Sequence, residues 1–224
     1  MALNGGNTVV ESAAIALINQ ERQRNGLRPL QVDATLNRLT AIKAQDMAVN
    51  QSCEHYSPTI GGDEGVLLNR EGITNVYAVF NIACGPGSTL DTAQKVVNAW
   101  INSPPHYANI LDPNITRIGI GQVYSPQNNT NYWSMIATSD FQARNGWVQQ
   151  GGKWYFYVNG IPQTGWVQVG ELWYLLDNTG AWTQWLYKAP FYHYYNGTNW
   201  STYYYDAQNK QWWFWNGTAW VRSQ

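Results

Sequence analysis

Aromatic residues recur with a fixed period in the second half of this 224-residue chain. Two series advance in steps of 19 residues, namely Trp147, Trp166 and Trp185, and Trp154, Trp173 and Tyr192. A fixed period of about 20 residues indicates stacked supersecondary units rather than one conventional core. Because turns rich in glycine and asparagine separate the aromatic pieces, each unit is predicted to be a β-hairpin, and the whole region a solenoid of hairpins.

The composition changes where this repeat begins. Eleven of the 13 tryptophans and 10 of the 15 tyrosines lie after residue 145, whereas only seven of the 27 charged residues do. Before that point the composition is that of an ordinary globular protein. We therefore predict two domains built on different principles, comprising residues 1–141 and 146–224, with residues 142–145 as a short linker.

Charge and hydropathy exclude several classes of function. The formal net charge is −1 and lysine and arginine are scattered singly, so the sequence argues against a nucleic-acid surface. No apolar run approaches the ~18 residues of a membrane span. The first residues have neither a basic region nor an apolar region, so we expect no signal peptide here. The protein is then either cytosolic or begins after a signal that has been removed.

The first 141 residues carry helical periodicity first and strand periodicity last. Apolar spacing predicts helices over residues 10–25, 34–50 and 93–101, with Asp33 as the N-cap of the second. Residues 51–91 are expected to be mostly loop, with one short apolar piece at 76–83. Alternation then predicts two strands, 118–124 and 132–138, joined as a hairpin. This order favours an α+β fold with helices packed against a sheet.

Two of the three histidines, His55 and His106, lie in proline-containing turn segments and could meet in one cleft. They could be polar cleft residues bonded to backbone, a pair that shares a metal, or a catalytic pair. Each cysteine lies near one of the segments expected to form this cleft, and Cys53 and Cys84 are either two buried thiols or one disulfide. A free Cys84 could form a thiol–imidazole pair with a histidine, which a disulfide would prevent.

The first domain resembles the CAP superfamily of cysteine-rich secretory, antigen-5 and pathogenesis-related proteins, in its bacterial form. The resemblance covers roughly residues 13–141. It rests on ordered motifs that include Leu17-Ile-Asn-Gln-Glu-Arg22, His55-Tyr-Ser-Pro58, Asn81-Ile-Ala83, Trp100-Ile-Asn-Ser103, His106-Tyr-Ala-Asn-Ile-Leu111 and Ile118-Gly-Ile-Gly121. It implies an α/β/α sandwich with a large cleft that two histidines and two glutamates line, and in which the histidines often hold a divalent metal such as zinc.

Carried onto this sequence, the histidines fall on His55 and His106, whereas the glutamates fall on Phe80 and near Asn102 or Ser103, so both are absent. Two imidazoles are fewer ligands than the three or four of ordinary zinc sites, so we expect at most a weak zinc site at His55 and His106.

A carboxylate that orients an imidazole or acts as base would have to come from nearby acids. These acids are Glu54, Asp63, Glu64 and Glu71. The catalytic candidates are His55, His106 and, of these acids, Glu54. We expect a binding domain rather than an enzyme, with a metal-dependent, peptidase-like hydrolase and a lipid or sterol carrier as alternatives.

The second domain resembles the choline-binding or cell-wall-binding repeats of bacterial surface proteins. Gly-Trp-Val-Gln followed by Trp-Tyr occurs in residues 146–155 and again in 165–174, and residues 186–224 match more loosely. The resemblance implies ligand pockets formed by Trp147, Trp154, Tyr155, Trp166, Trp173, Tyr174 and Trp185. The alternative is a ladder of aromatic rings that only holds the repeats together.

Repeats of this kind imply an extracellular, cell-wall-associated protein, which favours the disulfide between Cys53 and Cys84. The expected partners are choline-bearing teichoic acid or cell-wall glycan, with a host protein or a lipid as further partner classes for the first domain. No nucleic-acid partner and no membrane span are expected.

Overall fold

The computed structural model describes residues 9–141 and 144–223. The chain divides into two compact units, and the main division falls between Arg144 and Asn145. The predictions made for the first eight residues, and for residues 142 and 143 of the linker, lie outside the described residues. In the part of the chain that is described, none of the helices has the length and apolar character that crossing a membrane requires.

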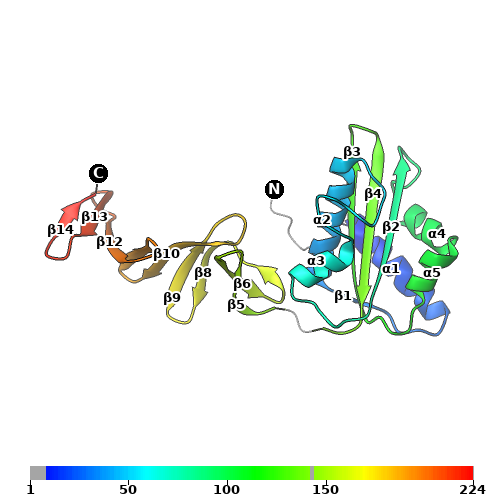
Figure 1. Cartoon of the computed structure of the whole chain (residues 1–224), viewed down its shortest axis with the longest axis horizontal. Coiled ribbons are helices and arrows are strands. Elements are labelled where there is room, and N and C mark those ends of the chain that lie inside the picture. The colour runs from blue at the N-terminus through cyan, green and yellow to red at the C-terminus, as the bar shows by residue number, and fades with distance from the viewer. Residues whose placement is uncertain (1–8, 142–143, 224) are drawn as a thin grey trace. The chain divides into compact units, whose positions relative to one another are not determined.

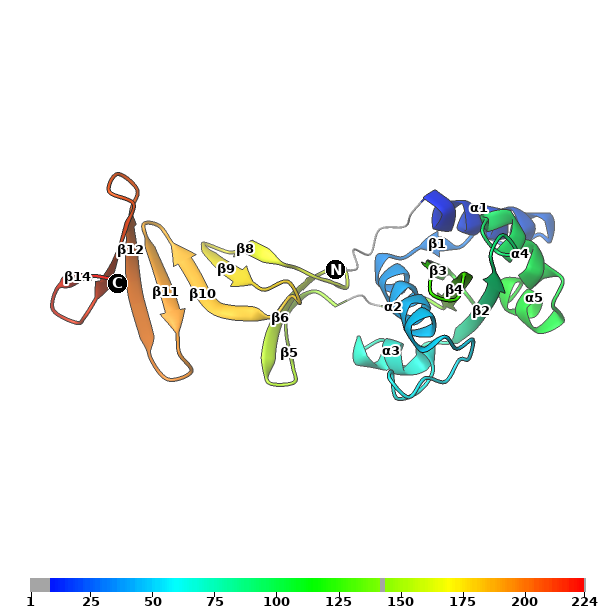
Figure 2. The same cartoon turned by 90° about the horizontal axis from the view of Figure 1, so that it is seen from above.

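The first unit alternates helices with a small sheet. Its elements are α1 (Val9–Arg24), β1 (Gln31–Val32), α2 (Ala34–Asn50), α3 (Glu64–Arg70), β2 (Ala78–Pro86), α4 (Ala93–Ile101), α5 (Pro104–Ile110), β3 (Arg117–Ser125) and β4 (Thr130–Thr138). The strands lie in the order β1-β3-β4-β2. Strand β4 pairs antiparallel with both β3 and β2, and the two-residue β1 pairs parallel with β3. Figures 1 and 2 show this sheet between two layers of helices.

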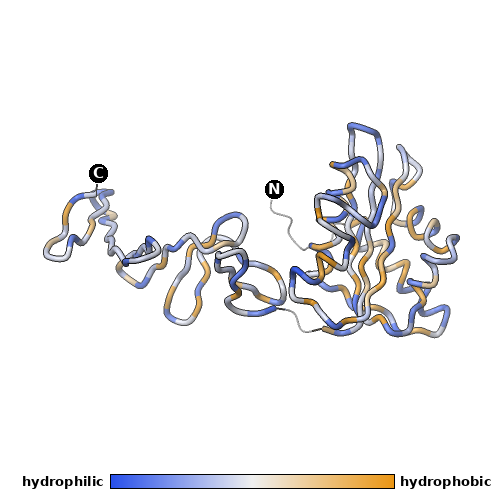
Figure 3. Tube along the Cα trace, viewed as in Figure 1, coloured by the Kyte–Doolittle hydropathy of each residue, from blue (hydrophilic) through white to orange (hydrophobic). Residues whose placement is uncertain are grey.

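The two faces of the sheet bury different helices, because successive side chains of a strand point to opposite sides. On β4, Trp133, Met135 and Ala137 join the cluster that contains α1 and α4. Ile136, between them in sequence, joins the cluster that contains α2 and α3. Figure 3 shows the resulting concentration of hydrophobic residues along the central strands. The predicted mixture of helices and sheet is confirmed, with helices on both faces.

Two glycines on β3 set the distance between the sheet and α2. A Cβ added at Gly119 would lie 2.3 Å from the carbonyl carbon of Leu36, and one at Gly121 would lie 2.4 Å from the backbone nitrogen of Ala41. Since real Cβ atoms do not approach backbone so closely, a side chain at either position would force the helix away from the strand. The helix itself begins where predicted, because Asp33 accepts hydrogen bonds from the backbone N–H groups of Thr35 and Leu36.

The prediction of mostly loop between residues 51 and 91 is wrong in two places. Residues 64–70 form α3, which Asp63 caps by accepting a hydrogen bond from the N–H of Gly65. Seven residues hold too few turns for a helical period to be recognised, and α3 forms because Leu67 and Leu68 are buried against the sheet. Strand β2 also extends to Pro86, beyond the apolar piece at 76–83.

The second unit is a run of short antiparallel strands. They are β5 (Gly146–Gln150), β6 (Lys153–Val158), β7 (Ile161–Pro162), β8 (Gly165–Val169), β9 (Leu172–Leu176), β10 (Trp182–Lys188), β11 (Phe191–Tyr195), β12 (Trp200–Asp206), β13 (Gln211–Trp215) and β14 (Trp220–Arg222). The strands β8 to β14 form one seven-stranded sheet in which each strand neighbours the next in sequence, and β5 to β7 form a three-stranded sheet. Glycines 151 and 152, both with positive φ, make the tight turn between β5 and β6. Consecutive antiparallel strands confirm the predicted hairpins.

Candidate functional sites

The backbone around His55 is fixed at three points. Cys53 is disulfide-bonded to Cys84 on β2, which confirms the bridged alternative and removes the thiol–imidazole pair. The fully buried Lys43 of α2 donates hydrogen bonds from Nζ to the carbonyl oxygens of Glu54, at 2.8 Å, and His55, at 2.6 Å. The hydroxyl of Ser57 donates to Asp46, also on α2, at 3.0 Å. The histidine therefore rests on a segment with little freedom to move.

The imidazole of His55 is held by the carboxylate of Glu64. Its Nδ1 lies 3.0 Å from each carboxylate oxygen of Glu64, a residue with no exposed surface at the start of α3. This hydrogen bond is the main cause that raises the pKa of His55, and burial of the ring opposes it. Glu64 thus has the orienting role that a carboxylate commonly has beside a functional histidine.

His106 lies in the first turn of α5. Its Nδ1 is 2.8 Å from the hydroxyl of Ser103, and its carbonyl accepts a hydrogen bond from the side chain of Asn81 at 3.0 Å. Burial lowers the pKa of His106, and the charge of His55 lowers it further. That the two histidines meet in one cleft stays a prediction.

Of the four acids that could replace the missing glutamates, Glu64 alone is hydrogen-bonded to His55 among the described residues. Glu54 is exposed and Asp63 caps α3. Glu71 forms an ion pair with Arg38 at 2.7 Å. Phe80 is partly buried against the apolar cluster of α2 and α3, so a hydrophobic side chain stands where the family resemblance implies a glutamate. The carboxylate that is hydrogen-bonded to His55 comes from α3, a helix that sequence periodicity did not reveal.

The side chains around His55 and His106 suit a divalent metal only in part. Both histidines use Nδ1 for a protein hydrogen bond, which leaves Nε2 as the nitrogen able to coordinate a metal. Among the described residues no cluster of three or more histidine, cysteine, aspartate or glutamate side chains is placed to hold an ion. His55 and His106 would therefore contribute two imidazole ligands, with the remaining positions left to water or a bound molecule.

The seven aromatic residues predicted to bind ligand occupy three kinds of position. Trp147 packs edge-on against Phe156 and Tyr174, with ring centroids 5.2 and 4.8 Å apart. Trp154 and Trp173 are partly exposed, and Tyr155 is half-buried. Trp166 and Trp185 line a cavity. The structure thus brings two of the seven to one pocket and places the other five outside it.

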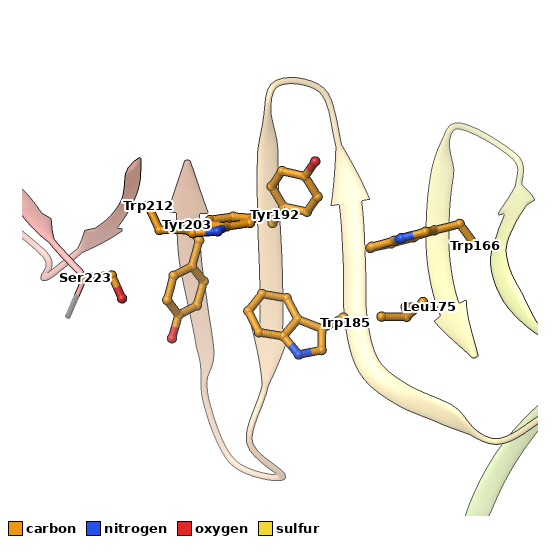
Figure 4. Close-up of a pocket in the computed structure, with 7 residues that line it drawn as sticks. All are labelled: Trp166, Leu175, Trp185, Tyr192, Tyr203, Trp212 and Ser223. Carbon is orange, nitrogen blue, oxygen red and sulfur yellow. The ribbon is translucent and has the colours of Figure 1, made fainter. Parts of the chain in front are cut away.

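That cavity, called the aromatic pocket below, has a volume of about 540 Å³. It is lined by Trp166, Leu175, Trp185, Tyr192, Tyr203, Trp212 and Ser223 (Figure 4). Tyr192 stands edge-to-face with both Trp166 and Trp212, at centroid distances of 6.2 and 4.9 Å, and Trp185 lies 5.2 Å from Tyr203. None of its lining side chains is charged. The pocket therefore offers several π faces in different orientations around one apolar space.

Sequence reasoning missed the pocket residues beyond Trp185, although a signal for them exists. Tyr192 belongs to the second 19-residue series, and one further step of 20 residues reaches Trp212. Tyr203 has no counterpart in the periodic pattern. It enters the pocket because β12 pairs antiparallel with β11, which places its ring beside that of Trp185.

A curated relative and two solved structures are similar to parts of this chain. The uncharacterized protein YkwD of Bacillus subtilis is 43% identical over 115 residues, which are 51% of this chain and 43% of the relative, so the chain spans less than half of that protein. An extracellular protein of Bacillus anthracis that contains an SCP domain is 25% identical, with a TM-score of 0.51, over 58% of this chain and 40% of the other. This likeness agrees with the fold of the first unit.

The choline-binding domain of Spr1274 from Streptococcus pneumoniae is 41% identical over 23% of this chain and 65% of the other, with a TM-score of 0.19, an overlap too small to assign a fold. The model of the cysteine-rich secretory protein family, CAP, matches residues 15–137, which contain His55, His106, strands β1 to β3 and all of β4 but its last residue. The chain therefore belongs to the cysteine-rich secretory protein (CAP) family.

Proposed function

We propose that the second unit binds quaternary ammonium groups such as choline on polymers of a bacterial surface, and that it holds the CAP unit at that surface outside the cell. The single observation that supports this proposal is the aromatic pocket, whose lining is uncharged and carries five aromatic rings. A quaternary ammonium cannot donate a hydrogen bond, so it is recognised by ring faces rather than by polar groups.

The size of the expected affinity follows from the number of rings. A cation held by three ring faces at about 1 kcal/mol each, plus partial burial of its methyl groups, gains roughly 3–4 kcal/mol. Such a free energy corresponds to a dissociation constant of about one to several millimolar. A single pocket is therefore weak, and firm attachment would come from many ligand groups along one polymer.

A choline titration followed by tryptophan fluorescence tests the proposal, because three indoles line the pocket. We expect a saturable change with a midpoint of about one to tens of millimolar. Trp185→Ala should remove it, whereas Trp154→Ala, at an exposed ring outside the pocket, should not. A flat response of the wild-type protein to choline, together with a response to cell-wall glycan, would refute choline binding. It would favour stacking of sugar rings on the aromatic side chains instead.

A second candidate function concerns the CAP unit, and the hydrogen bond between His55 and Glu64 favours it. A carboxylate on Nδ1 fixes the tautomer of the ring and raises the basicity of Nε2, which is the usual arrangement behind a metal-bound histidine. We propose that His55 and His106 share a divalent cation such as zinc. Calorimetric titration of wild type and of His55→Ala with zinc tests this. Absence of binding at micromolar or tighter affinity would refute the metal-dependent hydrolase, and absence of any zinc binding that depends on His55 would refute the shared cation.

The lipid-carrier alternative finds less support in the cavities of the CAP unit. One cavity of about 410 Å³ includes Gln45, Gln51 and Gln127 in its lining, and another of about 550 Å³ includes Arg22, Arg28 and Asp140. An acyl chain or a sterol needs a continuous apolar groove, and neither of these two cavities provides one.

A further inference from the structure

One cavity of the CAP unit lies away from His55 and His106, between the end of α1 and the segments that lead into β1 and β3. Its volume is about 550 Å³, and residues from 26–31 and 113–116 form most of its lining. Leu27, Pro113 and Ile115 give it apolar walls. A cavity of this size with apolar walls and a few polar groups is typical of a site for a small ligand.

Arg22, in the last turn of α1, places a buried cation at this cavity. The residue is only 2% exposed. Its Nε donates to the carbonyl oxygen of Arg28 at 2.9 Å, and its Nη1 donates to the carbonyl oxygens of Ile110 and Asp112 at 2.7 and 2.9 Å. These acceptors are all neutral, and among the described residues Arg22 forms no ion pair and its Nη2 has no acceptor.

This lack of a counter-ion has an energetic consequence. Burial lowers the pKa of Arg22, and the charge of Asp112 opposes this effect only in part. Removing a charge from water is costly unless another charge compensates it. Arg22 would therefore be stabilised by an anion that enters the cavity and accepts a hydrogen bond from Nη2.

The other charged residues of the lining leave room for one negative charge. Arg28 is exposed, and in the described part of the chain it forms no ion pair. Asp140 is already compensated, because it accepts hydrogen bonds from Nε of Arg117 at 3.1 Å and from the hydroxyl of Thr116 at 2.9 Å. The cavity thus offers two arginines whose charges are not matched by a carboxylate of the lining.

We propose that Arg22 and Arg28 bind the carboxylate of a ligand with a short apolar body, such as the C-terminal end of a peptide or a small free acid. The carboxylate accepts a charge-assisted hydrogen bond from Nη2 of Arg22, and the apolar walls take the body of the ligand. A carboxylate is favoured over a phosphate, because Asp140 repels a second negative charge and apolar walls solvate a dianion poorly.

Calorimetric titration of the full chain with N-acetyl-alanylalanine and with its C-terminal amide tests this site. The two ligands differ only in the charge at one end. We expect the acid to bind with a dissociation constant of about 0.1 to several millimolar. The amide should bind at least about tenfold more weakly, because it gives the buried cation no charged partner.

A third titration, with propionate, identifies the source of the carboxylate. Propionate carries the same charge on a short apolar body without a peptide bond. Binding of propionate as tight as that of the dipeptide assigns the site to a small free acid. Tighter binding of the dipeptide assigns it to the end of a peptide.

Arg28→Gln is the main variant, because removal of Arg22 would also break three hydrogen bonds within the fold. It should weaken binding of the acid about two- to fivefold, as loss of a partly exposed ion pair would, and leave binding of the amide unchanged. Arg24→Gln is the matched control. It removes the same charge from a nearby arginine that lies outside the cavity lining and pairs with Glu21, and it should keep the wild-type affinity.

Hydrogen exchange with and without the acid locates the bound ligand, and we expect protection of residues 22–31 and 112–117. Equal affinities for the acid and the amide would overturn the proposal, as would protection confined to the repeats. An Arg28→Gln variant that binds the acid like the wild type would also overturn it. Equal weakening by Arg24→Gln and Arg28→Gln would show a general effect of surface charge and overturn it as well. None of these results depends on choline binding by the second unit.

Discussion

Removal of the disulfide between Cys53 and Cys84 should destabilise the CAP unit by an amount that follows from the length of the loop that the disulfide closes. The two cysteines are separated by 31 residues in sequence. Closing a loop of this length in the unfolded chain corresponds to about 12 cal/mol/K of lost entropy, or about 3.7 kcal/mol at 25 °C. We expect the variant Cys53→Ser/Cys84→Ser to lose about this much of its free energy of unfolding, since the bridge constrains the unfolded chain more than it packs the folded one.

Hydrogen exchange resolved by peptide measures this loss for the CAP unit alone, which whole-protein fluorescence cannot do because 11 of the 13 tryptophans belong to the repeats. Amides of β3 and β4 that exchange only through global unfolding should exchange roughly 500-fold faster in the variant, the factor that corresponds to 3.7 kcal/mol. Peptides from β10 to β13 serve as the internal control, and their exchange should not change.

Two results would contradict this reasoning. A loss below about 1 kcal/mol in β3 and β4 would mean that the unfolded chain is already compact around the cysteines, so that the bridge restricts it little. Faster exchange confined to residues 53–63 would mean that the disulfide is a local clamp on the histidine segment and has little effect on global stability.

Three further predictions concern the CAP unit. Glu64→Gln should lower the pKa of His55, observed by NMR titration of its ring. In the wild type the raised pKa stabilises the fold below the unfolded-state value of about 6.5, and this contribution is lost as pH rises through the folded-state pKa, so the variant should lose stability mainly in acid. Gly121→Ala should lower the free energy of unfolding, measured by hydrogen exchange of β3 amides, by about 1–3 kcal/mol or more. The reason is that its Cβ would meet the backbone of Thr40 and Ala41 at 2.4 Å. Lys43→Met should lower the free energy of unfolding by about 2 kcal/mol or more, because the carbonyl oxygens of Glu54 and His55 lose their hydrogen-bond donor. Hydrogen exchange in residues 53–63 should rise first.

The fold could be predicted from the sequence wherever a hydrophobic pattern spans several helical turns or several strands. The capping Asp33 and a long apolar stripe predict helix α2. Alternation of apolar and polar residues predicts the hairpin of β3 and β4. Helix α3 was not accessible, because seven residues carry too short a pattern and its stability comes from burial of Leu67 and Leu68.

The candidate sites could be predicted only in part, because tertiary arrangement decides which side chains meet. His55 and His106 stand out because histidine is rare in this chain, and the charge of His55 contributes to lowering the pKa of His106. The sequence offered four acids as equal candidates to hydrogen-bond a histidine, and Glu64 was one of them. Which of the four does so depends on the side chain that α3 directs inward, and the sequence did not reveal α3. Among the aromatic residues, the 19-residue period identified the hairpins, but strand pairing decides which rings surround a common space, as for Tyr203.

The arrangement of the repeat sheet has a consequence for how the second unit melts. Among the described residues, strands β8 to β14 each pair with their neighbours in sequence, so stability is a sum of nearest-neighbour terms, and unfolding should spread from one strand to the next. The aromatic pocket takes residues from β8 through β13 and from Ser223 beyond β14. An occupant therefore bridges strands that otherwise sense each other only through a chain of intermediates. A ligand would convert a gradual, zipper-like transition into a more concerted one.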